Sequence, residues 1–192
     1  PGKVLLPIDG ENSIQKIKKI CLSSKTITDV VLATSDDSSD DALVDFAQSI
    51  NLDSFRGSLN DVLSRFTNAA LSKNADVVVY VGGDCPMLDI YAVDDAVQKL
   101  VDGNFDFVTN YQPATFPNGH DVNVITIEKL KELEIAANNN QLDKKKIFEI
   151  YKQIPFNLNN LINAKNNYQT LNDSDARALI YQKYLLSESN EE

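Results

Sequence analysis

Several residue types are scarce in this chain of 192 residues, and their scarcity excludes whole classes of protein. There is no tryptophan and only one histidine, and the two cysteines, Cys21 and Cys85, lack the paired spacing of a metal site. So few thiols favour a reducing compartment, and we expect a cytoplasmic protein. No apolar run approaches the roughly 20 residues that span a bilayer, and no signal peptide is found, so no membrane association is expected.

Positive charge is scarce as well. Eighteen lysines and arginines stand against 28 acidic residues, for a formal net charge of −10, and arginine occurs only at positions 56, 65 and 177. A nucleic-acid partner is therefore not expected, because no basic face is available to release counterions. Any polyanionic ligand must be held by a few local cations.

The length and composition fit one soluble domain over residues 1–192, with 43% hydrophobic and 24% charged residues. Strand-like and helix-like segments alternate along it. This order predicts an α/β fold with a mostly parallel sheet flanked by helices. The expected strands are residues 29–34, 54–55, 77–81, 105–109 and 121–127, and the expected helices follow residues 9–10 and cover 41–50, 59–72, 93–101 and 127–137.

The pattern changes beyond residue 128. A helix near residues 144–152 is followed by an asparagine-rich stretch at 157–167, and a last helix is expected from residue 173 to about 186. Because asparagine suits turns and irregular backbone, residues 128–170 are interpreted as a divergent helical subdomain or a dimerisation element.

The most informative segment is the apolar run at residues 77–81, which stops at Gly82 and Gly83 and is followed by Asp84. A run that is apolar throughout is typical of a strand buried on both faces of a parallel sheet. Ligands of such sheets bind beyond the carboxyl ends of the strands. At that position Asp84 supplies a hard oxygen ligand for a phosphate-bound Mg²⁺, and the two glycines let the backbone come close to a ligand. The alternative is a plain turn that closes the strand.

Four segments occur in a characteristic order: PGK at residues 1–3, FRGSLNDVLSRF at 55–66, GDCPMLD at 83–89 and FPNGHDV at 116–122. Together they resemble the cytidylyltransferases of the spore-coat polysaccharide type, relatives of the enzymes that make CMP-activated 3-deoxy-manno-octulosonate and CMP-acylneuraminates. The resemblance covers about residues 1 to 127, and the second segment is its most specific part.

The resemblance implies a Rossmann-like domain of the glycosyltransferase-A kind. It implies transfer of a cytidylyl group from CTP to a sugar, an acidic one by the same likeness, with Mg²⁺ and release of pyrophosphate for surface-glycan synthesis. It also implies a homodimer. Attack at the α-phosphate needs positioning and charge neutralisation more than covalent help, which a carboxylate-held cation and a lysine supply.

The resemblance also implies the site residues. Lys3 matches the lysine that ends the phosphate-binding loop, and Asp84 matches the metal ligand; together they are the expected catalytic pair. A solvated lysine at a chain end is the alternative for Lys3. The expected nucleotide-binding residues are Lys3, Thr34, Arg56, Gly57, Ser58 and Gly83.

Arg56 has a competing interpretation, and two residues near these positions, Asp36 and Arg65, are interpreted as structural. The guanidinium of Arg56 suits a phosphate or a cytosine carbonyl, but an ion pair with Asp61 is almost as good an explanation. Thr34 ends a strand at the same edge of the sheet and is expected to border the base, whereas helix capping is the simpler role for the nearby Asp36. Arg65, on the following helix, is interpreted as structural.

On the acceptor side the resemblance implies Asp121, with His120 beside it. His120 is the only histidine of the chain and a substitution relative to the family, and a hydrogen-bonded structural role is the alternative. Cys85 is expected to pack as a small apolar residue behind the site.

The chain departs from the family pattern at several points. We expect a further central strand and an arginine- and serine-bearing phosphate loop upstream of Pro1. Asn172 stands where the family has its second metal-binding aspartate, and Asn123 stands where it has a glutamate. The family's Glu-His-Val-Thr segment is replaced near residues 144–148. These departures keep open a non-catalytic relative that binds a nucleotide or only dimerises and, more remotely, a glycosyltransferase.

Overall fold

The computed structural model describes residues 2–110 and 119–140, and the account below concerns these residues. A short 3₁₀ helix (Lys3–Leu5) and a small hairpin, β1 (Pro7–Ile8) and β2 (Glu11–Asn12), precede the main elements. The main elements then follow in the order α1 (Ser13–Leu22), β3 (Val31–Ser35), α2 (Asp41–Ser49), β4 (Asp53–Gly57), α3 (Val62–Ser72), β5 (Val77–Tyr80), α4 (Ile90–Gly103), β6 (Phe107–Thr109), β7 (Asn123–Thr126) and α5 (Ile127–Asn140).

The strands form two groups. β3 and β4 pair in parallel, from Val31 opposite Asp53 to Ser35 opposite Gly57. β7 lies between β5 and β6 and is antiparallel to both, so β5 and β6 run in the same direction. The predicted α/β class is confirmed, with β7 reversed relative to β5 and β6. β7 follows β6 without an intervening helix among the described residues, and an antiparallel neighbour needs no crossover helix.

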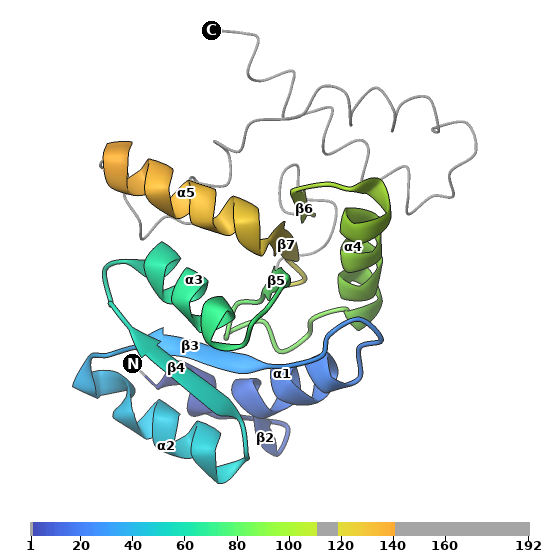
Figure 1. Ribbon diagram of the computed structural model, residues 1–192. Helices are drawn as coiled ribbons and strands as arrows, with labels where there is room; N and C mark the ends of the chain where they lie inside the picture. The colour runs from blue at the N-terminus through green and yellow to red at the C-terminus, as the bar shows by residue number, and fades with distance from the viewer. Residues whose placement is uncertain (1, 111–118, 141–192) are drawn as a thin grey trace, which may run out of the picture.

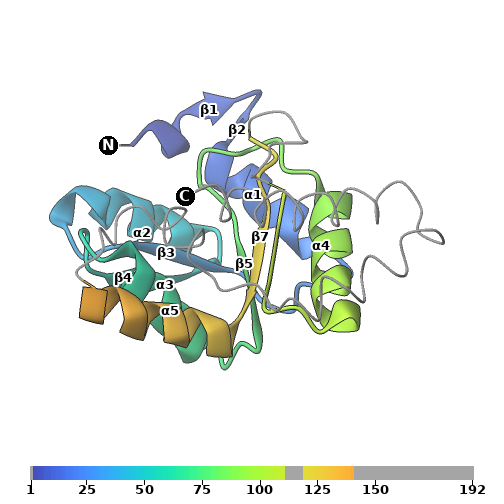
Figure 2. The same ribbon diagram turned by 90° about the horizontal axis from the view of Figure 1, so that it is seen from above.

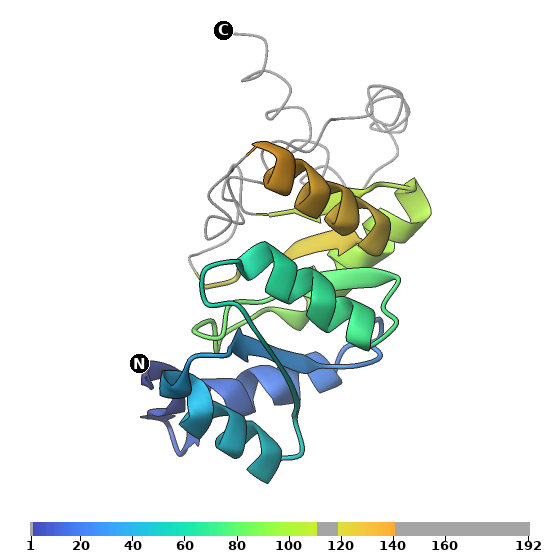
Figure 3. The same ribbon diagram turned by 60° about the vertical axis from the view of Figure 1, so that its left-hand side comes forward.

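Helices cover both faces of the strands. On one face α3 and α5 pack on β5, β6 and β7 through a core that includes Leu63, Ile125 and Leu130, all fully buried. On the other face α1 and α4 pack on the same strands around Val93 and Val124. Figure 2 shows α4 on one side of β5 and β7 and α5 on the other, and Figures 1 and 3 show α3 and α5 side by side.

Within the described residues, no ladder joins β3 to β5. Helix α1 spans the interruption, because Ile14 packs with the β3 side and Ile17 packs with the β5 side. All four residues of β5 are only half-buried, which is unusual for so apolar a strand. The central strand expected upstream stays a prediction.

The expected helices and strands correspond to observed ones, with shifted ends. The helix expected over residues 59–72 begins at Val62, because Asp61 caps it through the amide of Ser64, 2.9 Å away. β4 is longer than the two residues expected. Its sequence is mostly polar and does not indicate a strand of this length, which backbone pairing with β3 stabilises.

Helix α5 confirms the expected helix at residues 127–137 and packs into the main core through Leu130, Leu133 and Ala137. The first part of the expected 128–170 subdomain therefore shares the core of the domain. The helices expected at 144–152 and 173–186 and the asparagine-rich stretch 157–167 lie outside the described residues. In the described ranges, no helix has the length and hydropathy required to span a membrane.

Candidate functional site

The glycine turn after β5 is built to present Asp84. The Cys85 amide donates to the Gly82 carbonyl across 3.0 Å, which closes the turn. A Cβ at position 82 would lie 3.1 Å from both Asp84 Oδ1 and Cys85 Sγ, so a side chain there would force these atoms to shift by a few tenths of an ångström. Ser13 Oγ, in the first turn of α1, donates to the Gly83 carbonyl at 2.7 Å and ties the turn to the helix. Of the two glycines, Gly82 therefore has less room for a side chain, although only Gly83 is among the expected nucleotide-binding residues.

The two residues expected to be catalytic lie together. Lys3 Nζ and Asp84 Oδ2 are 2.8 Å apart although 81 positions separate them in the chain. Both side chains remain largely exposed, at 73% for Lys3 and 54% for Asp84. The hydrogen bond between them, followed by their charge attraction, raises the pKa of Lys3; it is also the main reason that the pKa of Asp84 is lowered. Both groups are therefore charged at neutral pH and reachable by a ligand.

The donor set fits a magnesium ion held jointly with phosphate. Among the described residues, no group of three or more histidine, cysteine, aspartate or glutamate side chains is placed to cage a metal. Mg²⁺ is commonly bound by one or two carboxylates together with substrate phosphates and water. The exposed carboxylate of Asp84 suits that mode. Asn172, the expected second metal position, lies outside the described residues.

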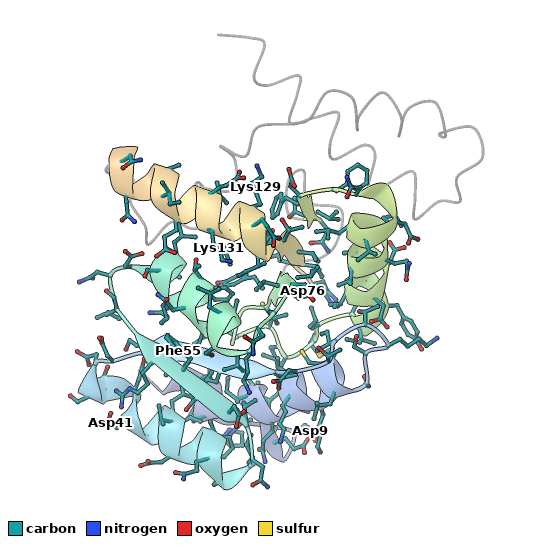
Figure 4. All side chains as sticks on the ribbon, in the orientation of Figure 1. Asp9, Asp41, Phe55, Asp76, Lys129 and Lys131 are labelled. Atoms are coloured by element: carbon teal, nitrogen blue, oxygen red, sulfur yellow. The ribbon has the colours of Figure 1, made fainter. Side chains whose placement is uncertain are left out.

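The side chain of Arg56 is hydrogen-bonded to residues between the end of β3 and the start of α2. Its Nε donates to the Ser35 carbonyl at 3.1 Å, one terminal nitrogen donates to the Asp37 carbonyl at 2.9 Å, and the other pairs with Asp41 Oδ1 at 2.7 Å. The ion pair considered with Asp61 is therefore wrong in its partner, because Asp61 caps α3 instead. Figure 4 shows Asp41 at the start of α2, below the strand that carries Phe55.

Thr34 also has an internal partner. Its hydroxyl donates to Asp40 Oδ2 at 2.7 Å, and its side chain is almost fully buried. The carboxylate that caps the short 3₁₀ helix (Ser38–Asp40) belongs to Asp37, which accepts from the Ser39 amide, and not to Asp36 as expected. The loop between β3 and α2 is thus held by its own side chains, with Arg56 as its anchor on β4.

The Gly57–Ser58 segment is supported by Arg65. A Cβ at position 57 would lie 3.1 Å from Arg65 Cγ, so glycine lets the arginine stem pack closely against β4. One terminal nitrogen of Arg65 donates to the Ser58 carbonyl at 2.8 Å. This agrees with the structural role expected for Arg65. Its Nε, however, is buried and has no hydrogen-bond partner.

On the acceptor side, Asn110 clamps the segment that carries Asp121. Its Nδ2 donates to the His120 carbonyl at 2.8 Å, and its Oδ1 accepts from the Val122 amide at 2.7 Å. Burial raises the pKa of Asp121, and His120 opposes this only in part. Burial also raises the pKa of Cys85, with further contributions from the charges of Asp84 and Asp121. Asp84 and Asp121 therefore both lie close to Cys85.

Two further residues at this edge are Tyr80, which the sequence does not single out, and Asn123, which the sequence marks only as a departure from the family pattern. They are register partners on β5 and β7, and Asn123 is 1% exposed. Asn123 Oδ1 accepts from the Thr109 hydroxyl at 2.6 Å, but its Nδ2 has no partner. The usable signal was the polar residue itself, inside a strand that is otherwise apolar from Val122 to Ile125.

Comparison with known protein sequences gives one consistent result. The family described as cytidylyltransferase matches residues 1–184. An uncharacterised protein of Methanocaldococcus jannaschii is 36% identical over 108 residues, which are 56% of this chain and 44% of that protein. The spore coat polysaccharide biosynthesis protein SpsF of Bacillus subtilis is 29% identical over 142 residues, 70% of this chain and 59% of SpsF. An 8-amino-3,8-dideoxy-manno-octulosonate cytidylyltransferase of Shewanella piezotolerans is 29% identical over 99 residues, 50% of this chain and 40% of the enzyme.

Solved structures show the same fold. A cytidylyltransferase from Leptospira borgpetersenii superimposes with a TM-score of 0.67 at 21% identity, covering 98% of this chain and 88% of that one. A CMP:2-keto-3-deoxy-manno-octonic acid synthetase in complex with CTP gives a TM-score of 0.58 at 15% identity, covering 78% and 79% of the two chains. The chain spans about half the length of the relatives matched by sequence. Because the family match extends over nearly the whole chain, the chain belongs to the cytidylyltransferase family.

Proposed function

We propose that this protein transfers a cytidylyl group from CTP to a hydroxyl of an acidic sugar and releases pyrophosphate, as a step in surface-polysaccharide synthesis. The observation that carries the proposal is the exposed Lys3–Asp84 pair at the carboxyl end of β5. A related protein is described as a cytidylyltransferase, and a protein of the same fold is described as complexed with CTP.

The described residues suit the separate tasks of this reaction. Asp84 would hold Mg²⁺ against the phosphates of CTP, where the ion neutralises negative charge. The ammonium of Lys3, kept protonated by its neighbour, donates to a phosphate oxygen. The partly buried carboxylate of Asp121, whose pKa is raised, accepts a hydrogen bond from the attacking sugar hydroxyl. We further propose that the enzyme works in the cytoplasm as a homodimer.

A second candidate is a relative that binds a nucleotide without catalysing transfer. The bonding of Arg56 favours this candidate, because its three side-chain nitrogens are bonded to residues from the end of β3 to the start of α2. The Thr34 hydroxyl is likewise bonded within the fold. Two of the expected nucleotide-binding side chains would therefore have to exchange internal partners for ligand.

Pyrophosphate release from CTP and Mg²⁺ tests the proposal, with a panel of acidic and neutral sugars and the variant Asp84→Asn. We expect sugar-dependent release that Asp84→Asn lowers at least about 100-fold, the usual scale for losing a group that stabilises transition-state charge. Asp45→Asn, an exposed position on α2, is the matched control.

Calorimetric titration with CTP separates the candidates. CTP binding without release from any sugar would establish the non-catalytic relative. A protein that binds no CTP would overturn both candidates.

A further inference from the structure

The carboxyl edge of the sheet holds a row of polar side chains that the proposed reaction has not used. Tyr80 on β5, Asn123 on β7 and Thr109 on β6 are direct register partners across the three strands. They share the face that packs on α3, because the Tyr80 ring lies 4.7 Å from the Phe66 ring of that helix. The row begins four residues before Asp84 and therefore adjoins the candidate site.

Asn123 has a hydrogen-bond donor that the fold does not use. Its carbonyl oxygen accepts from the Thr109 hydroxyl, which sets the orientation of the amide group. The Nδ2 group, on the other side of the amide, is buried without a partner. Buried polar groups are nearly always hydrogen-bonded to protein or to ordered water, so an unused donor at a ligand edge is open to an acceptor that a ligand brings.

Arg65 supplies a second unused donor on the same side. It precedes Phe66 on α3, and one terminal nitrogen is fixed on the Ser58 carbonyl. Its Nε is buried and has no hydrogen-bond partner. Its charge lowers the pKa of Tyr80, against a larger upward effect of burial, so guanidinium and phenol are neighbours. Arg65 and Asn123 thus flank Tyr80 from α3 and from β7.

The chemistry of the missing partner follows from the charges around it. Asp84 and Asp121 stand at the same edge, in a chain of net charge −10, and they repel an anionic ligand. An anion is accepted there only beside a cation, and a guanidinium with a free N–H is the group that best binds a carboxylate. The charge of Arg65 also lowers the pKa of Asp40, but that carboxylate is already bonded to Thr34 and Ser35.

We infer that Arg65 Nε and Asn123 Nδ2 donate hydrogen bonds to the carboxylate of the acceptor sugar and thereby select acidic acceptors. The inference rests on the proposed function and assigns the acceptor-reading residues of that site. The carboxylate is assigned to the acceptor and not to CTP, because CTP has no carboxylate and because Asn123, the first residue of β7, lies two positions after the acceptor-side Asp121.

The test compares Arg65→Met and Asn123→Leu with the wild type. Methionine keeps the stem that packs on Gly57, and leucine fills the volume of the asparagine without a donor. The controls are Lys131→Met on α5, labelled in Figure 4, and Asn68→Leu on α3, both at exposed positions. Each variant is measured for CTP affinity by calorimetry, and for KM with 3-deoxy-manno-octulosonate, N-acetylneuraminate and the neutral N-acetylglucosamine.

We expect both variants to raise KM for the acidic sugar that the wild type uses by at least 10-fold, with CTP affinity changed less than 2-fold and both controls unchanged. An unchanged KM in the folded Arg65→Met variant overturns the inference. A loss of CTP affinity as large as the rise in KM also overturns it. The same holds if the wild type uses only the neutral sugar, or if it binds CTP but turns over neither acidic sugar. A wild type that binds no CTP instead refutes the proposed function on which the inference rests. Thermal unfolding checks that each variant is folded.

Discussion

Lys3 and Asp84 show how two exposed side chains can set one another's charge without contributing much to stability. Their hydrogen bond is the largest cause of the raised pKa of Lys3 and of the lowered pKa of Asp84. Exposed ion pairs contribute little to folding, because water screens them and both side chains lose conformational freedom. The pair is therefore expected to matter for ligand binding and very little for unfolding.

The variant Lys3→Met should raise the pKa of Asp84 toward its ordinary range and leave the melting temperature unchanged. A carboxylate whose pKa is lowered in the folded state stabilises it above its unfolded pKa and loses that contribution as the pH falls. Here the exposure of both groups makes that contribution small. Carboxyl ¹³C NMR titration, with Asp84→Asn for assignment and Lys131→Met as control, measures the shift. A pKa of Asp84 that does not move would contradict the pairing.

Asp121 is expected to show the opposite linkage. Burial raises its pKa, so the folded protein binds the proton more tightly than the unfolded chain, and the ionised form costs stability at neutral pH. That cost disappears as the pH falls below the unfolded value of about 3.9.

Asp121→Asn should therefore raise the melting temperature at pH 7 by about 1–3 °C, while it lowers turnover. For a chain of this length, that rise corresponds to a gain of under roughly 1 kcal/mol in the free energy of unfolding. The gain should vanish near pH 3.5. Scanning calorimetry against pH measures it, and Asp45→Asn corrects for the general effect of removing one negative charge. A variant less stable than the wild type at pH 7 would show that Asp121 has a stabilising partner.

At the scale of elements, α5 is the informative helix, because the sequence assigned most of it to a separate subdomain. Leu130 is fully buried against Leu63 and Ile125. Leu130→Ala should lower the free energy of unfolding by about 2–4 kcal/mol through lost burial and a cavity. Ile135→Ala, at a position 61% exposed on the same helix, should change it by less than about 0.5 kcal/mol. Urea denaturation compares them, and similar small losses would place α5 outside the core.

At the scale of the whole molecule, the described strands are unequally supported. β7 has a partner on each side, whereas β3 pairs with β4 alone and β5 pairs with β7 alone among the described residues. Backbone amides in strands paired on both sides open least often. We expect peptides that contain β7 to exchange hydrogen at least about 10-fold more slowly than those containing β3, as mass spectrometry measures. Equal protection would mean that β3 has a second strand partner, as the expected upstream strand would provide.

Much of this architecture follows from the order of residues. The helices follow from apolar spacing and from capping residues such as Asn12, which forms a capping box with Gln15. β5 follows from its apolar run. The extent of β4 does not follow from the sequence, because its residues are mostly polar and it is a strand through its pairing with β3. The direction of β7 does not follow from the sequence either, because side-chain alternation is the same in parallel and antiparallel strands.

The sequence by itself determined the α/β class, the family resemblance and the members of the Lys3–Asp84 pair, since these depend on local periodicity and on short motifs. Only the tertiary structure decided that Arg56 pairs with Asp41, that Gly82 has less room for a side chain than Gly83, and that Arg65 and Asn123 have unused donors. The reason is physical. Local patterns record what neighbouring residues do, whereas the partners of a side chain are fixed by segments that approach it only when the chain is folded.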